Sequence, residues 1–390
     1  MKKEFVQDLL DHVWQLQKNT WGEGYTSGIH NNWIRAARNC GQKIEIERKN
    51  GHPYIHFFRP DGSFRGTLDP WVLPTTTRSS SQACASKVKT RYFLERANVP
   101  TPETQDYREG EAQKAYEDFF QSATSRQAVV KAHNLSQGIG VYLNVTPSNF
   151  VETFDSCIEL QKERKRSPKV LVQEMLDGFE LRCTVVEGEL VDVIARIPAY
   201  VIGTGRHSIE ELAALKNESR LADRFLARRK LNLEEYNTKA KMLAEGISPT
   251  FAPEEGELII LSSISNIAYG GETAIVTDLV SDSIRSIAER AVAAIPGLTT
   301  GGVDVMVNSL DSDSPKVIEV NSFPHAYISI YPTYGNPTNP LDLYLQRWFL
   351  VDDFERGDRN EFTLEEKEFL EKYYAFIKQK LGLVGGLFVK

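Results

Sequence analysis

Val317-Ile318-Glu319-Val320-Asn321 is the stretch that decides the fold. It alternates apolar and polar residues, so it predicts a strand with one buried face, and Glu319 and Asn321 point to the same side of it. A second apolar strand, Val303 to Val307, carries Asp304. An isolated carboxylate is usually a solvated surface group, but the apolar flanks of both strands argue against a solvated face here. Two carboxylates and an amide oxygen suit Mg²⁺, a hard cation that prefers oxygen ligands. The sequence therefore predicts a magnesium site on these strands.

Upstream, a lysine at the end of an apolar strand precedes a glycine-rich turn. The strand reads Ala128-Val129-Val130-Lys131-Ala132, and the turn reads Gln137-Gly138-Ile139-Gly140. Glycines let backbone N–H groups approach an anion, and the ammonium group of Lys131 neutralises its charge. Together they predict a phosphate cradle, although Lys131 taken alone could equally be an exposed strand end.

A third segment combines a strand with polar residues suited to a nucleotide. It reads Val172-Gln173-Glu174-Met175-Leu176-Asp177-Gly178-Phe179-Glu180-Leu181-Arg182. A strand that leaves the core here exposes backbone groups to an adenine edge. Glu180, a few residues later, is placed to accept hydrogen bonds from ribose hydroxyls.

The length, charge and composition of the whole chain limit the class of protein that it can be. Its 390 residues are too many for one compact core, and no apolar run approaches the ~20 residues of a membrane span. The formal charge of −7 argues against a nucleic-acid coat, and the basic run 162–169 is better explained as a solvated helix end. The cysteines Cys40, Cys84, Cys157 and Cys183 form no zinc-site spacing, and the first residues form no secretory signal. We therefore expect a reduced, cytoplasmic protein with neither nucleic acid nor membrane as a partner.

The expected elements divide the chain into four parts. These are an N-terminal α/β domain at 1–80, a central subdomain with the glycine-rich turn at 81–170, a C-terminal subdomain with the metal site at 171–350, and a helical tail at 351–390. Helices are expected over 4–18 and 83–98. The Thr- and Ser-rich stretch 75–81 predicts a linker or exposed loop. The charged stretch 208–246 predicts a helical insertion, which is either a solvated surface segment or a cover over the substrate.

Taken in order, these clusters resemble the ATP-grasp fold, and most closely the ligase module of cyanophycin synthetases and bifunctional glutathione synthetases. Those modules carry an Asp-Lys…Thr-Lys helix that ends in Gly-Val-Pro-Val-Pro. Here the corresponding residues are Ser86-Lys87…Thr90-Arg91 and Asn98-Val99-Pro100-Thr101-Pro102. The Arg-x-Pro-Ala and Gly-Asp-Gly segments of those modules stand here as Arg196-Ile197-Pro198-Ala199 and Gly203-Thr204-Gly205. Later matches are Asn266, Gly270-Gly271, Thr277, Glu319-Val320-Asn321, Pro332 and Gly335, so the resemblance covers about residues 84–345.

The resemblance implies an α/β (α+β) architecture, in which a small N-terminal domain accompanies two α+β subdomains that clasp ATP. It implies nucleotide-binding roles for Lys87, Lys131, Gln137, Gly138, Gly140, Gln173, Met175 and Glu180. It implies two Mg²⁺ ions, with Mn²⁺ as an alternative, held by Asp304, Glu319 and Asn321. Catalytic roles fall to Arg182, Arg196 and Asn266. Guanidinium groups are permanent cations with several donors, and they stabilise charge on a transferred phosphoryl group and a tetrahedral intermediate.

Three residues depart from the pattern of those modules. Ser86 and Thr204 replace aspartates, and Gln173 replaces an acidic residue. None of them is an expected metal ligand or phosphate-binding lysine, so we expect activity to survive.

The expected activity is that of an ATP-dependent, ADP-forming ligase, which converts a carboxylate to an acyl phosphate and couples it to an amine. An amino acid or short peptide is the expected substrate, and the resemblance favours a homodimer or homotetramer. Two alternatives remain: a kinase on the same fold, which phosphorylates a small molecule, and a silent ATP-binding module. The segment Arg196-Ile197-Pro198-Ala199 favours the ligase, and the intact metal residues argue against the silent module. Within the 322–340 loop, the residues His325, Tyr327, Tyr331 and Tyr334 are candidates for the substrate pocket, although they could equally be packing residues.

Overall fold

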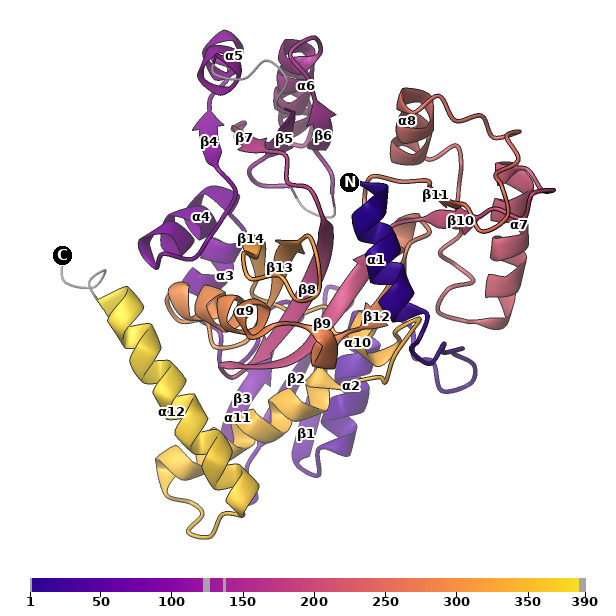
Figure 1. Ribbon diagram of the computed structural model, residues 1–390. Helices are drawn as coiled ribbons and strands as arrows, with labels where there is room; N and C mark the ends of the chain where they lie inside the picture. Colours follow the sequence, from indigo (N-terminus) through magenta and orange to yellow (C-terminus); the bar gives the residue numbers. More distant parts are fainter. Residues whose placement is uncertain (1, 122–126, 136–137, 386–390) are drawn as a thin grey trace.

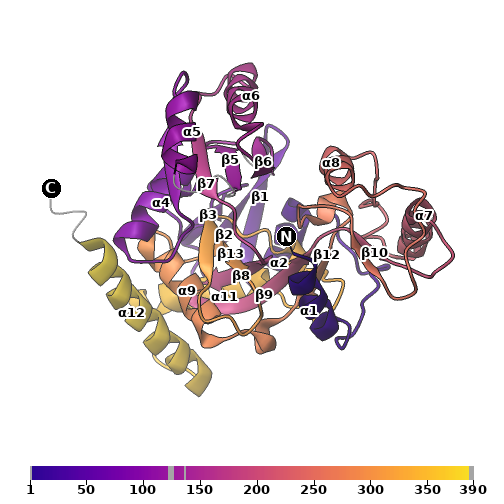
Figure 2. The ribbon, with the colours of Figure 1, turned by 45° about the horizontal axis from the view of Figure 1, so that its top comes forward.

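The computed structural model describes residues 2–121, 127–135 and 138–385 (Figure 1). Within these ranges, the strands form sheets of five, four, three and two strands. The five-stranded sheet lies at the centre, and Figure 2 shows the four-stranded sheet and the α7–α8 region on different sides of it. Mixed helices and antiparallel sheets agree with the predicted α+β class.

The central sheet has the strand order β12-β9-β8-β13-β14, with antiparallel neighbours. Its strands are β8 (Phe179–Val186), β9 (Glu189–Ile197), β12 (Glu272–Ile275), β13 (Gly301–Val307) and β14 (Lys316–Asn321). A two-residue turn joins β8 to β9, with φ of 47° at Glu187 and 84° at Gly188. Two positive φ values match the twist of a tight hairpin.

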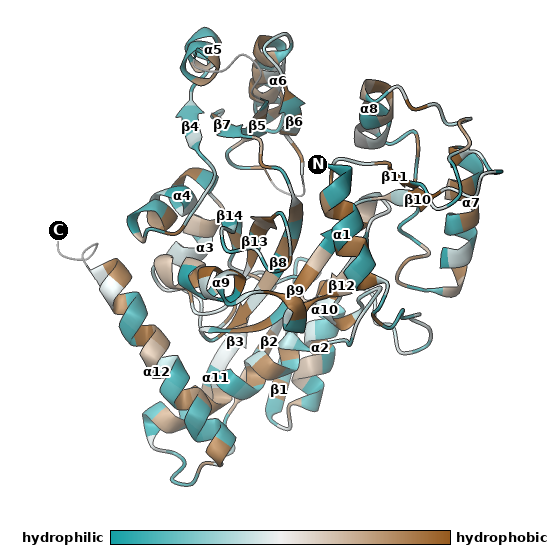
Figure 3. Ribbon diagram, viewed as in Figure 1, coloured by the Kyte–Doolittle hydropathy of each residue, from teal (hydrophilic) through white to brown (hydrophobic). Residues whose placement is uncertain are grey.

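Alternate residues of the central sheet build two different cores. Val193, Ala195 and Ile197 of β9 face a core that contains α1 (Lys3–Val13) and α9 (Asp282–Ala294). Ile194 faces the opposite way, toward α2 (Ile29–Asn39), α10 (Tyr327–Ile330) and α11 (Pro340–Arg356). Figure 3 shows hydrophobic residues along β8, β9 and β13. A strand covered on both faces reads as a nearly continuous apolar run, because neither side is left for water.

A separate core stabilises the four-stranded sheet, which has the order β4-β7-β5-β6. Its elements are β4 (Thr104–Tyr107), α5 (Ala112–Phe120), β5 (Ala128–Ala132), β6 (Val141–Val145), α6 (Phe150–Glu163) and β7 (Val170–Glu174). Phe120, Phe150 and Phe154 are buried between the two helices and the sheet. The chain then runs directly from β7 into β8 of the central sheet, so the segment 175–178 connects the two sheets.

The first 70 residues contribute to two regions of the molecule. The three-stranded sheet consists of β1 (Lys43–Lys49), β2 (His52–Phe58) and β3 (Phe64–Leu68), and it shares a core with α2 and α11. By contrast, α1 packs on the other side of the central sheet. After α1, the backbone of Lys18 bridges that of Tyr334, which in turn bridges Ala274 of β12. Asn19 reinforces this junction by donating to the carbonyl oxygen of Gly335 at 2.7 Å.

Three sequence-based expectations about helices are wrong in detail. The first helix ends at Val13 and not at residue 18. The stretch expected to be a linker contains the start of α3 (Arg78–Cys84), whose N-terminus is capped by Thr77. The single helix expected over 83–98 is two helices, because Ser86 caps a new helix, α4 (Lys87–Arg96). Ser and Thr side chains cap helix N-termini as readily as they occupy loops, and composition alone does not separate the two uses.

The insertion between β9 and β12 contains β10 (Tyr200–Ile202), α7 (Ile209–Ser219), η1 (Arg220–Ala222), α8 (Tyr236–Ala244), β11 (Leu258–Ile260) and η2 (Ile267–Tyr269). It has a small core of its own, which includes Val201, Leu212 and Met242. Phe225 extends from it into the core around α2 and α11. The helices α7 and α8 lie within the stretch 208–246 that was expected to be helical, and their inward-facing residues are buried in the small core.

The last part of the chain ends in α12 (Leu364–Val384), after η3 (Thr277–Leu279), α9 and α11. Lys380 is buried, and its ammonium group donates to the carbonyl oxygens of Val292, Ala293 and Ile295 at the end of α9. A cation there complements the helix dipole and fastens α12 to α9.

Within the described ranges, no helix is long and apolar enough to cross a membrane. The division of the chain into domains stays a prediction. The elements α3, β7 and α11 run across its expected boundaries.

Replacing Gly178 with alanine is expected to destabilise the protein by about 3 kcal/mol. Gly178 has φ of 136°, and a Cβ atom added there would lie 2.0 Å from the carbonyl oxygen of Val307 in β13. Thermal unfolding measures the effect, and Gly22→Ala is the matched control because nothing lies within 4 Å of its added Cβ atom. An unchanged melting temperature in Gly178→Ala would contradict this contact.

Candidate functional site

A group of four charged side chains lies on one face of the central sheet. The register pairs Asp304 of β13 with Arg182 of β8, and Glu180 of β8 with Arg196 of β9. Arg182 donates to both carboxylate oxygens of Asp304, through Nε at 2.5 Å and Nη2 at 3.0 Å. Arg196 contacts both Glu180 and Asp304, the latter at 3.5 Å. Residues two apart on a strand share a face, so the alternation of the strands brings these groups together.

The expected metal ligands lie on the same face. Glu319 of β14 is directly opposite Asp304, and Asn321 is opposite Gly302. The amide nitrogen of Asn321 lies 3.4 Å from Oδ2 of Asp304. Lys87, the first residue of α4, has its ammonium group 3.8 Å from Glu319. The structure therefore brings the three expected ligands and one expected phosphate-binding lysine into one neighbourhood.

Lys131 enters this neighbourhood from the other sheet. It lies on β5, is only 5% exposed, and donates to Oε1 of Gln173 on β7 at 2.8 Å. A cavity between α4, the four-stranded sheet and β14 is lined by Lys87, Lys131, Gln173 and Glu319, among others. The Gln173 amide also donates to Oγ1 of Thr104 at 2.9 Å. Gln173, one of the three departures from the pattern of the similar modules, therefore contacts and orients Lys131.

The glycine-rich turn joins β5 to β6. Gly138 and Gly140 have φ of 77° and 69°, values that favour glycine. Ala132 donates its backbone N–H to the carbonyl oxygen of Gly140 at 2.8 Å, which folds the turn back over the end of β5. Gln137 lies outside the described residues. Lys87 also reaches this region, donating to the carbonyl oxygen of Leu135 at 2.7 Å.

The electrostatics of the site favour a polyanion. Burial and the neighbouring Lys87 lower the pKa of Lys131 to about 8, with Glu319 acting in the opposite direction. On the central sheet, burial opposes ionisation of Asp304, but Arg182 and Arg196 hold its pKa below the ordinary value. Asp304 is therefore charged at neutral pH, while Lys87 and Lys131 are close enough to disfavour each other's charge. A bound phosphate chain relieves that repulsion.

The donor set of the site fits Mg²⁺. Asp304, Glu319 and Asn321 supply oxygen atoms from two paired strands, and a hard cation prefers oxygen ligands and keeps several waters. Lys87 and the two arginines already contact the carboxylates, so the group is built to hold positive charge. Among the described residues there is no cluster of three or more His, Cys, Asp or Glu side chains of metal-site geometry. The expected set has only two carboxylates, and the amide of Asn321 provides the third ligand.

Not every expected site residue takes part in this cluster. Oδ1 of Asn266 accepts the backbone N–H of Ala268 at 2.9 Å, which caps η2. Glu180 contacts Arg196, so in this structure its carboxylate is part of the charged cluster. Met175 lies on the segment between the sheets and donates its backbone N–H to Gln127. The catalytic role of Asn266, the adenine contact of Met175 and the ribose contact of Glu180 stay predictions.

The aromatic candidates of the 322–340 loop divide by burial. Tyr331 is 2% exposed, and its hydroxyl group bonds the backbone of Thr26 and the side chain of Asn32, so it is a packing residue. The ring of His325 lies between those of Phe323 and Tyr327. Tyr334 lines a cavity of about 330 Å³ that sequence reasoning missed. Its charged residues are Lys18, Lys216, Arg220, Asp223 and Glu272, which are too scattered along the chain to form a motif.

Comparison with known proteins agrees with this architecture. Residues 85–198 match the family described as phosphoribosylglycinamide synthetase, ATP-grasp (A) domain. The glutathione biosynthesis bifunctional protein GshAB of Desulfotalea psychrophila is 30% identical over 281 residues, 70% of this chain and 35% of that protein. GshAB of Enterococcus faecalis is 29% identical over 259 residues, 64% of this chain and 33% of that protein. The chain thus spans about a third of the length of these relatives.

A solved structure shows the same fold. The crystal structure of a bifunctional glutathione synthetase from Pasteurella multocida aligns with a TM-score of 0.53 and 22% identity, covering 82% of this chain and 43% of that one. The sheet order, the ordered motifs and these likenesses agree with one another. The chain therefore has the ATP-grasp fold, and its residues 85–198 match an ATP-grasp domain.

Proposed function

We propose that the protein is an ATP-dependent, ADP-forming ligase that couples a carboxylate to an amine. The observation that carries the proposal is the meeting of Lys87 and Lys131 with Arg182, Arg196 and the carboxylates of β13 and β14. Lysine ammonium groups bind a phosphate chain, and arginine guanidinium groups donate paired hydrogen bonds to carboxylate or phosphate oxygens. The relatives named for glutathione biosynthesis suggest an amino acid or a short peptide as substrate.

The proposed reaction has two steps. A substrate carboxylate oxygen attacks the γ-phosphorus of ATP, the bond to the β,γ-bridging oxygen breaks, and ADP leaves. The amine then attacks the acyl carbon, the acyl–oxygen bond breaks, and phosphate and a proton leave. Lys87 and Lys131 would bind the phosphates. Arg196 would donate to the oxygen that gains negative charge in each step, and positioning would contribute most of the acceleration.

We propose that Asp304, Glu319 and Asn321 hold two Mg²⁺ ions, with Mn²⁺ as an alternative metal. When bound, the metal supplies charge neutralisation on the β- and γ-phosphates. In the structure described here, Lys87 and the arginines partly neutralise the same carboxylates. Metal binding would therefore loosen these ion pairs and free the cations for the substrate.

The affinity for ATP is expected to fall as the pH rises above about 8, approaching tenfold per pH unit. The pKa of Lys131 is lowered to about 8, so its ammonium group is charged below that pH and neutral above it. A bound phosphate favours the charged form, so binding weakens as the proton is lost. Calorimetric titration with MgATP from pH 7 to 9.5 measures the slope. Lys131→Arg should flatten it, because guanidinium keeps its proton, and an equally steep slope in that variant would exclude Lys131 as the cause.

A substrate panel tests the proposed function. Purified protein with MgATP is supplied with pairs of amino acids or short peptides, and free phosphate, ADP and product mass are measured. Equal amounts of ADP, phosphate and amide are expected for the correct pair. A phosphorylated product without free phosphate would identify a kinase, and absence of MgATP binding by calorimetry would overturn both. Light scattering in the same buffer tests whether the protein is the homodimer or homotetramer that we propose.

A further inference from the structure

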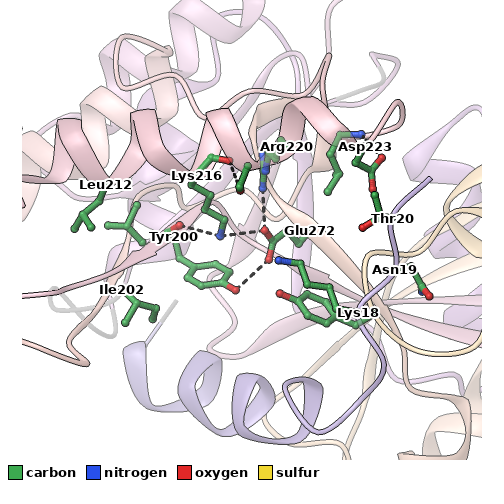
Figure 4. Close-up of a pocket in the computed structure, with 14 residues that line it drawn as sticks. Lys18, Asn19, Thr20, Tyr200, Ile202, Leu212, Lys216, Arg220, Asp223 and Glu272 are labelled. Carbon is green, nitrogen blue, oxygen red and sulfur yellow. Dashed lines mark hydrogen bonds and ion pairs between the residues drawn. The ribbon is translucent and has the colours of Figure 1, made fainter. Parts of the chain in front are cut away.

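The cavity of about 330 Å³ lies between α7, η1, β10 and the segment 18–20 that follows α1 (Figure 4). It is on the opposite face of the central sheet from the phosphate-binding cluster. Glu272 of β12 pairs in register with Ile197, which faces the core containing α1 and α9. Arg196, the neighbour of Ile197, points to the other face and reaches Asp304. A ligand in this cavity is therefore held apart from the site of phosphoryl transfer.

Glu272 is at the centre of the cavity wall and is already saturated with donors. Its Oε1 atom accepts from Lys216 and Arg220 at 3.0 Å each, and Oε2 accepts the hydroxyl of Tyr200 at 3.0 Å. Figure 4 shows these contacts as dashed lines that converge on Glu272. Although burial opposes ionisation, Lys216 and Arg220 lower the pKa of Glu272 to about 2, so it is charged at every ordinary pH.

The second acidic residue of the wall is also occupied. Asp223 accepts the backbone N–H groups of Phe225 at 2.7 Å and Leu226 at 3.0 Å through Oδ1, and that of Trp21 at 3.2 Å through Oδ2. It shapes the turn after η1 and joins the insertion to the N-terminal segment. Neither carboxylate of the wall has an oxygen without a donor.

The cations of the wall differ in how many partners they have. Lys216 also donates to the carbonyl oxygen of Tyr200 at 3.1 Å, and Nη1 of Arg220 donates to that of Arg229 at 2.6 Å. Three of them, Lys18, Lys216 and Arg220, face two carboxylates. The Arg220 side chain is 3% exposed, and its Nε atom is buried without a hydrogen-bond partner in the part of the chain that the structure describes. Lys18 is exposed at the cavity and forms no ion pair within that part. Burial lowers the pKa of Lys216 to about 8, and an anion beside it would favour its charged form. Three cations and two carboxylates leave the wall with one net positive charge, which suits a ligand that carries a single carboxylate.

The remaining lining residues are of two kinds. Asn19, Thr20 and Ser219 are polar, whereas Val201, Ile202, Leu212, Leu226, Tyr200 and Tyr334 are apolar or aromatic. A concavity of at least ~300 Å³ in which polar groups converge beside apolar ones is typical of small-molecule sites. The apolar side of the cavity favours a ligand with a hydrocarbon portion next to its carboxylate.

We propose that this cavity binds a small organic carboxylate with an apolar portion, at a site separate from the nucleotide. The carboxylate contacts Lys18, Lys216 and Arg220, and the hydrocarbon portion packs on Leu212 and the neighbouring strand. A free acid and the C-terminal end of a peptide share this chemistry. The proposal does not depend on ligase activity, because binding can be measured without ATP.

Calorimetry of the full chain without nucleotide tests the proposal. The probes are N-acetyl-leucine for a free acid, glycyl-glycyl-leucine for a peptide end, and N-acetyl-leucine amide as the neutral counterpart. At least one of the two acids is expected to bind at least tenfold more tightly than the amide. Equal binding of acids and amide, or binding of none of the three, would overturn the proposal.

Variants locate the site. Lys18→Ala changes an exposed side chain, and Lys216→Gln leaves Glu272 with Arg220 and Tyr200 as partners. Each substitution is expected to weaken acid binding by about tenfold, because it removes one charge-assisted hydrogen bond to the carboxylate. Lys367→Ala, an exposed lysine on α12, is the matched control and should bind as the unmodified chain does. Lys87→Ala should also bind the acids normally. Loss of acid binding in Lys87→Ala, or normal binding in both cavity variants, would place the acids at the nucleotide site and contradict the proposal.

Discussion

Glu319→Ala is expected to lower turnover by about 10³-fold or more. Glu319 lies opposite Asp304 on paired strands and is one of the three proposed metal ligands. Loss of a metal ligand forfeits several kcal/mol of charge neutralisation during phosphoryl transfer. The substitution also removes the carboxylate that faces Lys87 at 3.8 Å, which leaves that lysine without its acidic neighbour.

A binding measurement separates metal loss from general damage. The unmodified protein is expected to bind ATP more tightly with Mg²⁺ than with EDTA, and Glu319→Ala should lose most of that difference. Glu152→Ala, an exposed glutamate on α6, serves as the matched control and should retain it. Near-normal turnover or an unchanged magnesium effect in Glu319→Ala would mean that the metal site lies elsewhere.

Arg196→Lys is the second substitution with a large expected effect, a loss of about 10²- to 10³-fold in amide formation. Arg196 reaches Glu180 and Asp304 at the same time, and lysine keeps the charge but not the planar fork. The defect should be in kcat, with MgATP affinity within about threefold of the unmodified protein, because Lys87 and Lys131 still bind the phosphates.

Arg206→Lys is the control for this substitution, since Arg206 is an exposed arginine of the insertion. It should leave both kcat and MgATP affinity unchanged. If Arg196→Lys instead raised the dissociation constant for MgATP with little change in kcat, Arg196 would be a nucleotide-binding residue and not a stabiliser of the transferred group.

Much of the central sheet was predictable because its strands carry their own signals. Val303–Val307 and Val317–Asn321 are largely apolar runs, and the two-residue spacing of Glu319 and Asn321 placed these two residues on one face of their strand. The pairing of β13 with β14 then sets Asp304 opposite Glu319. The helices were harder. Ser86 and Thr77 cap helices, but the same residue types are common in loops, so one helix was expected where two exist and a linker where α3 begins.

The second cavity could not be predicted, for a physical reason. Lys18, Lys216 and Glu272 come from three distant parts of the chain, and each looks like an ordinary surface residue in its own segment. Only the folding of the insertion against β12 and the segment after α1 brings them together. The cluster around Lys87, Lys131, Asp304 and Glu319 differs because each of its residues lies in a short motif, whose glycines and apolar flanks indicate strands and turns.

The junction between the segment after α1 and the loop 332–335 has a consequence for how the molecule is made. Asn19 contacts Gly335 across 316 positions of sequence, and Gly335 in turn donates its backbone N–H to Gln17 at 2.8 Å. Contacts between such distant positions form late, because the loop that they close is long. Residue 335 is synthesised only after more than four-fifths of the 390-residue chain. The segment that contains Lys18 can therefore complete the cavity only late in synthesis. A nascent chain therefore has the strands β5 and β7, which carry Lys131 and Gln173, well before this cavity is complete.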